Sequence, residues 1–427
     1  MQTIPYQIID NQILALLPDG EVEFLDIGLK NQIDCYNDQL IEHLDYKVYV
    51  LSDVCLNLHN FHTAAPLIAF IEVTNLCNLE CKHCYASSRH RRENEMSTPM
   101  IFKLIDEFDE MGVLQVFLTG GEIFTHKDAV QIIQYASTKK FTTQIFTNGT
   151  YVTEKIVQQM PENVAFAISF DTASPERTVR GKMDYPKLKE VFDLLRQYNL
   201  PFRTAVSVHK NNINDVEEIF EWCILNGYPR PQWLETFASG RALRNLNILL
   251  DESDFESVFE VYKRCMDKYC VTEACAIGLE GRETANVVHS IKTIQMVERL
   301  EVATRVPKLG TTMAYINSAG EVFPDSSCLD FPEFIGGSLY GESFYNIWHN
   351  GFGNIRKYTF EDFKFCSLCP INQSGMHCHF RDYGLSKNIM GDYLSCGATE
   401  YVKLMIMNTH DYWLEQTNNG YKLKLVI

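Results

Sequence analysis

The stretch "IEVTNLCNLECKHCYASS" at residues 71–88 places Cys77, Cys81 and Cys84 within eight residues, directly after an apolar run. Thiolates hold iron–sulfur clusters, and the usual full set is four. Three neighbouring thiolates can hold three irons of a [4Fe–4S] cube, so the fourth iron is open to a ligand from outside the chain. The alternative is a zinc site in which His83 or His90 supplies the fourth ligand.

From residue 66 onward, apolar strands alternate with helical segments. The predicted strands are 67–74, 114–119, 142–147, 164–170, 202–208 and 232–237, and the predicted helices are 98–111, 127–139, 153–160, 186–198, 213–226 and 251–268. This rhythm predicts an α/β fold with a parallel sheet, wound as a partial (β/α)6 barrel of the TIM type. Parallel barrels carry their chemistry at the C-terminal ends of the strands, where the cysteine-rich stretch begins.

Charge and composition exclude several kinds of partner. The 427 residues include 38 basic and 55 acidic side chains, a formal net charge of −17, so we expect no nucleic acid partner. The sequence has no apolar run of about 18 residues that could span a membrane and no signal peptide, so we expect a cytoplasmic protein. In that reducing compartment its 14 cysteines are not a disulfide framework. Cys55 and Cys223 are expected to be small buried side chains.

The strand–helix rhythm stops near residue 275 and divides the chain into four parts. Residues 1–64 form a small N-terminal module, with short strands expected at 6–10, 13–17 and 21–27 and weakly helical sequence after them. Residues 65–274 form the barrel. Residues 275–398 are rich in loops and clustered cysteines, which indicates a small metal-stabilised domain. Its segment 313–324 predicts a hairpin with a turn at Ser318–Gly320. Residues 399–427 form a terminal segment that we expect to be partly helical.

The cysteine spacing C-x3-C-x2-C, with the aromatic His83 before the third cysteine, resembles the signature of the radical SAM superfamily. The resemblance implies that Cys77, Cys81 and Cys84 ligate a [4Fe–4S] cluster. The open iron would bind the amino and carboxylate groups of S-adenosylmethionine. Electron transfer into the sulfonium then yields a 5′-deoxyadenosyl radical that abstracts hydrogen from the substrate, while the protein positions the cofactor.

Further motifs at the ends of later strands carry the same resemblance. The cofactor-binding positions that it implies are Gly120, Gly121, Glu122, Asn148, Ser169, Asp171 and Arg180. The glycines and Glu122 match a GGE motif that contacts the methionine amino group, since glycine lets carbonyls approach a small cation. Arg180 matches an arginine that pairs with the methionine carboxylate, a task suited to a planar fork donor. Ordinary strand-end turns and a surface arginine are the alternative interpretation.

The last predicted strand is followed by "SGRAL" at residues 239–243, which resembles a Gly-Arg element of one subgroup of the family. Ser239 or Arg241 could contact the adenosine or the substrate. The C-terminal cysteines resemble the SPASM domain (related to the twitch domain) of that subgroup, which usually holds two auxiliary [4Fe–4S] clusters. Four thiols suffice for one cluster, namely Cys366, Cys369, Cys378 and Cys396.

This chain departs from the SPASM pattern. Asp325 stands where the family usually has a cysteine after "GEVFP", and Ser374 or Gly375 stands at another cysteine position. The resemblance therefore implies one auxiliary cluster rather than two. Cys328 could replace one of its ligands or bind a second, incomplete cluster. The cysteine-rich stretch 265–275 fits no cluster spacing, although Cys275 could be a ligand.

SPASM-bearing radical SAM enzymes mostly modify peptides, and "GVLQVFLTGGEIFTH" resembles the thioether-forming maturases of ribosomal peptides. We therefore expect an enzyme whose partners are a precursor peptide and a reductant such as flavodoxin or ferredoxin. Residues 1–64 are either a reduced peptide-recognition module of winged-helix type, which binds a leader peptide as an added strand, or a packing embellishment. The alternatives are a radical SAM dehydrogenase or cofactor-biosynthesis enzyme acting on a small molecule, and a non-catalytic zinc-binding scaffold. No residue is marked as the general base.

Overall fold

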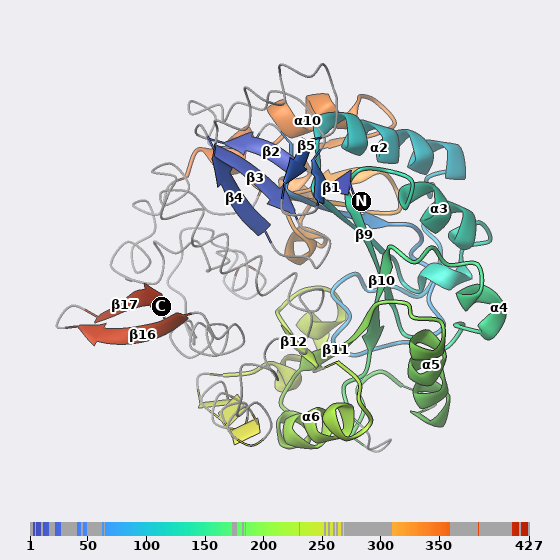
Figure 1. Ribbon diagram of the computed structural model, residues 1–427, viewed down its shortest axis with the longest axis vertical. Helices are drawn as coiled ribbons and strands as arrows, with labels where there is room; N and C mark the ends of the chain where they lie inside the picture. The colour runs from blue at the N-terminus through green and yellow to red at the C-terminus, as the bar shows by residue number, and fades with distance from the viewer. Residues whose placement is uncertain are drawn as a thin grey trace.

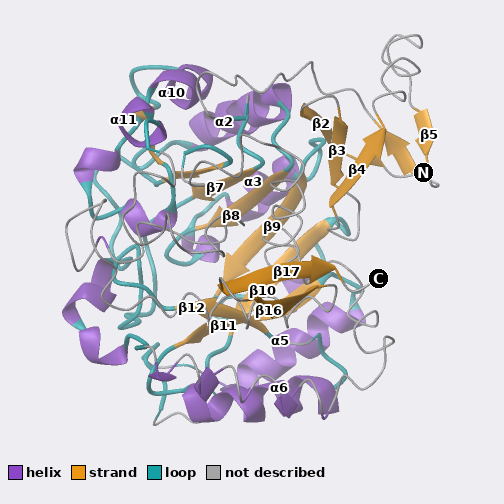
Figure 2. Ribbon diagram, turned by 90° about the vertical axis from the view of Figure 1, so that its left-hand side faces the viewer, coloured by secondary structure: helices purple, strands orange, loops and turns teal. Residues whose placement is uncertain are grey.

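The structure is a computed structural model that describes the chain in several stretches. They are strands between residues 3 and 48, residues 62–63, 65–172, 177–181, 183, 185–229 and 231–251, single helical residues as far as 268, residues 310–358 and 383, and strands 412–417 and 420–425. The largest sheet has nine strands in the order β12-β11-β10-β9-β8-β7-β13-β14-β15. Figure 2 shows β7 to β12 side by side in the middle of the molecule.

Six parallel strands build the barrel part of this sheet. They are β7 (Ile68–Glu72), β8 (Gln115–Thr119), β9 (Thr142–Thr147), β10 (Val164–Ser169), β11 (Phe202–Val208) and β12 (Gln232–Glu235). Each pairs in parallel with the next one along the chain. The predicted partial (β/α)6 barrel is confirmed, and each strand lies within its predicted range.

Helices connect these strands and cover one face of the sheet, following one another around its outside in Figure 1. They are α2 (Thr98–Met111), α3 (Ala129–Ala136), α4 (Glu154–Val157), α5 (Tyr185–Gln197) and α6 (Val216–Leu225). Helix α2 ends at Gly112, whose left-handed φ of +81° suits a glycine C-cap. In the described stretches, no helix has the length and apolar character needed to cross a membrane.

The hydrophobic core lies between the sheet and these helices. Ile71, Leu118, Ile145, Ile168 and Val206, one from each of five strands, are fully buried in it. Because side chains alternate along a strand, the residues next to them in sequence point to the inner side of the barrel. The face of the sheet toward the helices is therefore apolar, and the face toward the inside of the barrel can carry polar side chains.

A hairpin from the C-terminal half extends the sheet beyond β7. Strand β13 (Met313–Ile316) pairs in parallel with β7, β14 (Glu321–Phe323) is antiparallel to β13, and β15 (Gly337–Ser338) is antiparallel to β14. The predicted hairpin at 313–324 is confirmed, with a φ of +75° at Gly320 in its turn. The hairpin and the barrel thus share one sheet, although the sequence places them in different parts of the chain.

Two short helices, α10 (Phe344–Asn350) and α11 (Gly353–Arg356), follow the hairpin. The N–H of Phe344 donates to Oε2 of Glu107 on α2 at 2.7 Å, and the rings of Phe108 and Phe344 lie 4.8 Å apart. On the same helix, Nε1 of Trp348 donates to the carbonyl of Thr63 at 2.6 Å. These contacts fasten the C-terminal half to the outside of the barrel.

The N-terminal part contains six short strands in the residues that the structure describes. They are β1 (Thr3–Ile4), β2 (Tyr6–Ile9), β3 (Gln12–Leu16), β4 (Val22–Asp26), β5 (Ile41–His43) and β6 (Tyr46–Val48). Strands β2, β3 and β4 form an antiparallel sheet in chain order and overlap the three predicted strand segments. A second, mixed sheet pairs β1 with β6 in parallel and β6 with β5 in antiparallel fashion. Strands β5 and β6 lie where weakly helical sequence was expected, so that expectation is wrong for these residues. Cys55 lies outside the described residues.

The expectation of helix near the C-terminus is wrong for the residues that the structure describes. Strands β16 (Tyr412–Thr417) and β17 (Gly420–Leu425) pair as an antiparallel hairpin. Strand β17 alternates apolar and polar residues from Tyr421 to Leu425, and Asn418 and Asn419 separate the two strands, with Gly420 pairing opposite Thr417. That combination favours a β-hairpin over a helix.

Candidate active site

The loop after β7 carries the three clustered cysteines. Cys77 and Cys81 are 9% and 8% exposed and pack with Leu79, and Cys84 lies against this small cluster. All three are free thiols, and the N–H of Leu79 donates to the sulfur of Cys77 at 3.4 Å. Burial raises the pKa of Cys77 to about 11 and that of Cys81 to about 12. An uncompensated buried thiolate is costly, so this sulfur donor set fits a soft metal centre that neutralises it.

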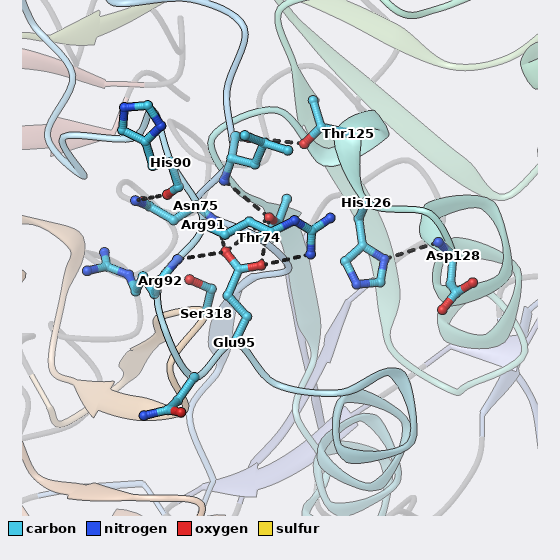
Figure 3. Close-up of polar contacts among 12 residues, drawn as sticks. Thr74, Asn75, His90, Arg91, Arg92, Glu95, Thr125, His126, Asp128 and Ser318 are labelled. Atoms are coloured by element: carbon cyan, nitrogen blue, oxygen red, sulfur yellow. Dashed lines mark hydrogen bonds and ion pairs between the residues drawn. The ribbon is translucent and has the colours of Figure 1, made fainter.

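The far end of the cysteine loop is tied back to the end of β7 by Glu95 (Figure 3). Its carboxylate accepts from the N–H of Asn75 at 2.7 Å, from Oγ1 of Thr74 at 3.0 Å and from Nη1 of Arg91 at 3.2 Å. Asn75 also donates from Nδ2 to the carbonyl of His90 at 3.0 Å. The loop is therefore closed on itself by one carboxylate, which the sequence analysis did not single out.

A second carboxylate fixes the loop to the hairpin of the C-terminal half. Glu72, the last residue of β7, is fully buried, and its Oε1 accepts from Oγ of Ser318 at 2.6 Å and from Nε of Arg92 at 3.3 Å. Ser318 lies in the β13–β14 turn, and Met96 donates its N–H to the Ser318 carbonyl at 2.7 Å. The β13–β14 turn therefore holds the C-terminal end of the cysteine loop in place.

The Gly120–Gly121 turn after β8 packs against the start of the cysteine loop. The N–H of Gly121 donates to the carbonyl of Thr74 at 2.7 Å, and the N–H of Glu122 donates to that of Leu76 at 2.9 Å. A Cβ atom would lie 2.7 Å from the Thr74 carbonyl oxygen at Gly120, and 2.5 Å from the Leu76 carbonyl oxygen at Gly121. The glycines thus allow two backbone segments to approach closely. The sequence predicts a different role for them, namely contact with the cofactor.

Glu122 joins the ends of β8 and β9. The side chain is 1% exposed, and its two oxygens accept from Oγ1 of Thr147 and from the N–H of Asn148, both at 2.7 Å. Burial raises the pKa of this carboxyl group despite these hydrogen bonds. Asn148 in turn donates from Nδ2 to Oδ1 of Asn78 on the cysteine loop at 2.9 Å. Both predicted residues therefore lie beside the three thiols.

Asp171 and Arg180 form a buried ion pair beside the same loop. Nε and Nη2 of Arg180 lie 2.5 and 2.8 Å from the two carboxylate oxygens, and Nη2 also donates to Oγ of Ser207 at 3.2 Å. Burial opposes ionisation of Asp171, but the adjacent guanidinium outweighs it and holds the pKa of that carboxyl below its usual range. The carbonyl of Arg180 lies 3.8 Å from the sulfur of Cys81. Ser169 is half-buried at the end of β10.

The 3-10 helix η3 (Gly240–Arg244) lies directly on the cysteine loop. Arg241 donates from Nε to the carbonyl of Cys81 at 2.8 Å, from Nη1 to that of Ser88 at 3.0 Å, and from its N–H to that of Cys84 at 2.9 Å. Gly240 has a φ of +58°, and a Cβ there would lie 2.2 Å from the Cys84 carbonyl oxygen. Arg241 therefore binds the loop that carries the thiols.

The histidines that a zinc site would need do not surround the thiols in the described residues. His90 is exposed, and its contact in Figure 3 runs through its carbonyl. The Nε2 atom of His83 lies 3.9 Å from Oδ2 of Asp171, and its ring stacks on that of His209 at 5.9 Å. Burial lowers the pKa of His83. His209 follows β11 directly. Because functional residues of parallel barrels lie at the C-terminal ends of strands, its position in the sequence could have identified it.

The predicted auxiliary ligands are only partly within the described residues. Cys366, Cys369, Cys378 and Cys396 lie outside them, as do Cys270 and Cys275. Cys328 is fully buried at the end of a 3-10 helix (Ser326–Cys328), with its sulfur 3.9 Å from Oγ of Ser327. Asp325 caps that helix, since its side chain accepts from the N–H of Ser327 at 2.8 Å. Cys223 is fully buried, as expected.

Comparison with known proteins agrees with this geometry. The sequence profile of the Radical SAM superfamily matches residues 71–223, which run from β7 into α6. The AdoMet-dependent heme synthase of Methanosarcina barkeri (strain Fusaro / DSM 804) is 25% identical over 348 residues, which are 78% of this chain and 95% of that protein. The antilisterial bacteriocin subtilosin biosynthesis protein AlbA of Bacillus subtilis (strain 168) is 26% identical over 294 residues, or 67% of this chain and 60% of AlbA.

A solved structure shares the fold. Streptococcus suis SuiB bound to precursor peptide SuiA has a TM-score of 0.61 with this chain at 14% identity. The match covers 84% of this chain and 91% of the SuiB chain, so it extends beyond the barrel. At this identity the likeness shows a common architecture.

Proposed function

Residues 71–223 form a radical SAM domain, and we propose that the chain uses it to modify a ribosomally made precursor peptide. The observation that carries this proposal is the loop after β7, in which three free thiols lie together against buried apolar side chains. The expected reaction is hydrogen-atom abstraction from the peptide, followed by formation of a thioether or another crosslink.

We propose that Cys77, Cys81 and Cys84 hold the [4Fe–4S] cluster of the radical SAM superfamily. Together with S-adenosylmethionine, that cluster supplies a 5′-deoxyadenosyl radical. Three sulfurs leave one iron for the cofactor, and the N–H of Leu79 donates to one of them, a contact of the kind that tunes such centres. Arg241 contributes by fixing the carbonyls of the loop.

We assign cofactor binding to the polar residues around this loop, with roles that the contacts refine. Gly120, Gly121, Glu122 and Asn148 shape the turns that flank the cofactor, and Ser169 offers a hydroxyl at the end of β10. The Asp171–Arg180 pair presents both a negative and a positive group beside Cys81. Such a pair complements the amino and carboxylate groups of a methionine. The guanidinium of Arg180 would bind the methionine carboxylate while it stays paired with Asp171.

Three further features complete the proposal. Cys366, Cys369, Cys378 and Cys396, with Cys328 as a further candidate, would hold one auxiliary [4Fe–4S] cluster in residues 275–398. Residues 1–64 would bind the leader peptide by strand addition, a mode in which an extended peptide pairs with the edge strand of a sheet. A flavodoxin or ferredoxin would supply the electron in the cytoplasm, where cysteines stay reduced.

A second candidate function is a radical SAM reaction on a small molecule such as a haem precursor. It is favoured by the match to the heme synthase, which covers 95% of that protein. The peptide is favoured by AlbA, which is named for bacteriocin biosynthesis, and by the extended fold match to SuiB, which is bound to its precursor peptide.

The test is to search beside the gene for a short open reading frame, to coexpress the encoded peptide with the enzyme, and to analyse that peptide by mass spectrometry. A crosslink appears as the loss of two hydrogen atoms.

Cys81→Ala should abolish cleavage of S-adenosylmethionine, and Cys223→Ala, which changes a buried thiol outside the loop, should preserve it. Cys366→Ala should retain uncoupled cleavage without product. An unmodified peptide, together with turnover of a tetrapyrrole, would favour the second candidate, and a colourless zinc protein would end both.

A further inference from the structure

Arg356 is a buried arginine that the proposed reaction does not use. It is the last residue of α11 and is 6% exposed. Its Nε donates to the carbonyl of Gly310, but Nη2 has no hydrogen-bond partner in the stretches that the structure describes. Because a carbonyl is neutral, this contact leaves the positive charge of the guanidinium unbalanced.

Two aromatic rings contact the guanidinium but do not replace an anion. Cζ of Arg356 lies 4.7 Å from the ring centre of Trp348 and 5.3 Å from that of Phe352. Such contacts balance a cation only in part, because a ring carries no net charge. Burial lowers the pKa of Arg356 to about 9, and no described carboxylate opposes this effect. A water molecule could accept the remaining N–H, but it would not balance a charge whose burial is costly without an ionic partner.

His349 on α10 supplies a second unpaired group beside this charge. Burial and the Arg356 guanidinium both lower the pKa of His349, so the two side chains are close enough to interact. Nδ1 of His349 lies 3.2 Å from Nε2 of His62, whereas its own Nε2 is buried with no partner among the described residues. When His62 is the donor in this pair, Nε2 of His349 carries a hydrogen. The imidazole then offers a second N–H near the guanidinium.

We propose that Nη2 of Arg356 and Nε2 of His349 bind a singly charged oxyanion, namely a carboxylate or dihydrogen phosphate. Such an anion has an oxygen acceptor for each donor, and its charge balances one guanidinium beside a neutral imidazole. A metal cation would instead add to the positive charge. The two donors lie on α10 and α11, and α10 is fastened to the barrel through Trp348 and the carbonyl of Thr63. The bound anion would therefore stabilise the C-terminal half where it packs on the barrel.

The experiment measures binding of inorganic phosphate and of acetate to the anaerobically reconstituted full chain by calorimetry, in a zwitterionic buffer. The midpoint of denaturant unfolding is measured in the same solutions, with chloride at equal ionic strength as the reference. The wild type should bind at least one of the two oxyanions, and that anion should raise its unfolding midpoint above the value in chloride. Tighter binding of acetate would identify the ligand as a carboxylate, and tighter binding of phosphate would identify it as a phosphate.

Arg356→Met, which fills a similar space without charge, should weaken binding of the anion about 10- to 100-fold and should lose the rise in midpoint. His349→Phe removes one neutral donor and should weaken binding roughly 3- to 10-fold. In chloride, Arg356→Met should unfold at the same denaturant concentration as the wild type or a higher one, because an apolar side chain replaces an unbalanced buried charge. The matched control is Arg196→Met on α5, where the arginine is exposed and pairs with Asp193; it should respond like the wild type.

Three outcomes would overturn the inference. An equal response of the wild type to phosphate, acetate and chloride would show screening by salt rather than a site. Unchanged affinity in Arg356→Met would place the anion elsewhere on the chain. A clearly lower midpoint of Arg356→Met in chloride, or its failure to fold there, would show that the protein itself balances the guanidinium. None of these results bears on the thiol loop, so the proposed function is judged by its own test.

Discussion

Gly240→Ala tests whether η3 sets the position of the cysteine loop. The change has two costs. A left-handed φ of +58° disfavours alanine by roughly 1–2 kcal/mol. In addition, the new Cβ would lie 2.2 Å from the Cys84 carbonyl oxygen and 2.3 Å from that of Tyr85, an overpacking cost of about 1–3 kcal/mol. The expected destabilisation is therefore about 2–5 kcal/mol.

Gly181→Ala is the matched control. Gly181 also has a positive φ, +89°, but a Cβ there would meet nothing within 4 Å, so only the first cost applies. Relief of the Gly240 contact requires the backbone beside Cys84 to move by about 0.8 Å, which exceeds the roughly 0.5 Å tolerance of a preorganised site.

The assay is iron and sulfide content after reconstitution, alongside the midpoint of denaturant unfolding of the apoprotein. Gly240→Ala should unfold at lower denaturant than Gly181→Ala and should bind clearly less iron on the thiol loop. Full iron content together with equal midpoints for the two variants would refute the reasoning that η3 positions the loop.

Three further predictions use other contacts. Arg241→Lys should lower iron content, because a lysine cannot serve the carbonyls of Cys81 and Ser88 together as a planar fork does; unchanged iron would contradict this. Trp348→Phe removes the hydrogen bond to the carbonyl of Thr63 and should destabilise the chain by about 1–3 kcal/mol in denaturant unfolding. Because burial lowers the pKa of His209 to about 4, the unfolded chain binds more protons between pH 6.5 and pH 4. Stability should thus fall by on the order of 1–2 kcal/mol from pH 7 to pH 5, and less steeply in His209→Asn.

The barrel could be predicted from the sequence because its signals are local. Segments such as 142–147 and 202–208 are rich in β-branched and aromatic residues, and they match β9 and β11 residue for residue. Helix α2 also has its predicted bounds, since a proline lies in its first turn and Gly112 ends it. The cysteine loop follows from the same logic, because it begins where a parallel strand ends.

The partners of the loop could not be predicted, because they depend on contacts between distant residues. Nothing in the sequence near Arg241 indicates that its guanidinium binds the carbonyls of residues 81 and 88. The pairing of β13 with β7 joins segments that are about 240 residues apart, and strand pairing of that range leaves no local signal. In the terminal segment, Asn418 and Asn419 followed by Gly420 are a hairpin signal, and this signal outweighs the helical tendency expected from composition.

The cysteine loop has almost no regular structure of its own, yet its peptide groups are held from several sides. Glu122 and the glycine turn hold its start, Arg241 holds its middle, and Glu95 and Ser318 hold its exit. These partners lie on different elements, so the spacing of the sulfurs is a property of the folded barrel and hairpin together. A destabilising change far from the thiols, at any of these contacts, should therefore reduce metal binding before it unfolds the chain, because local opening of a loop needs less free energy than global unfolding.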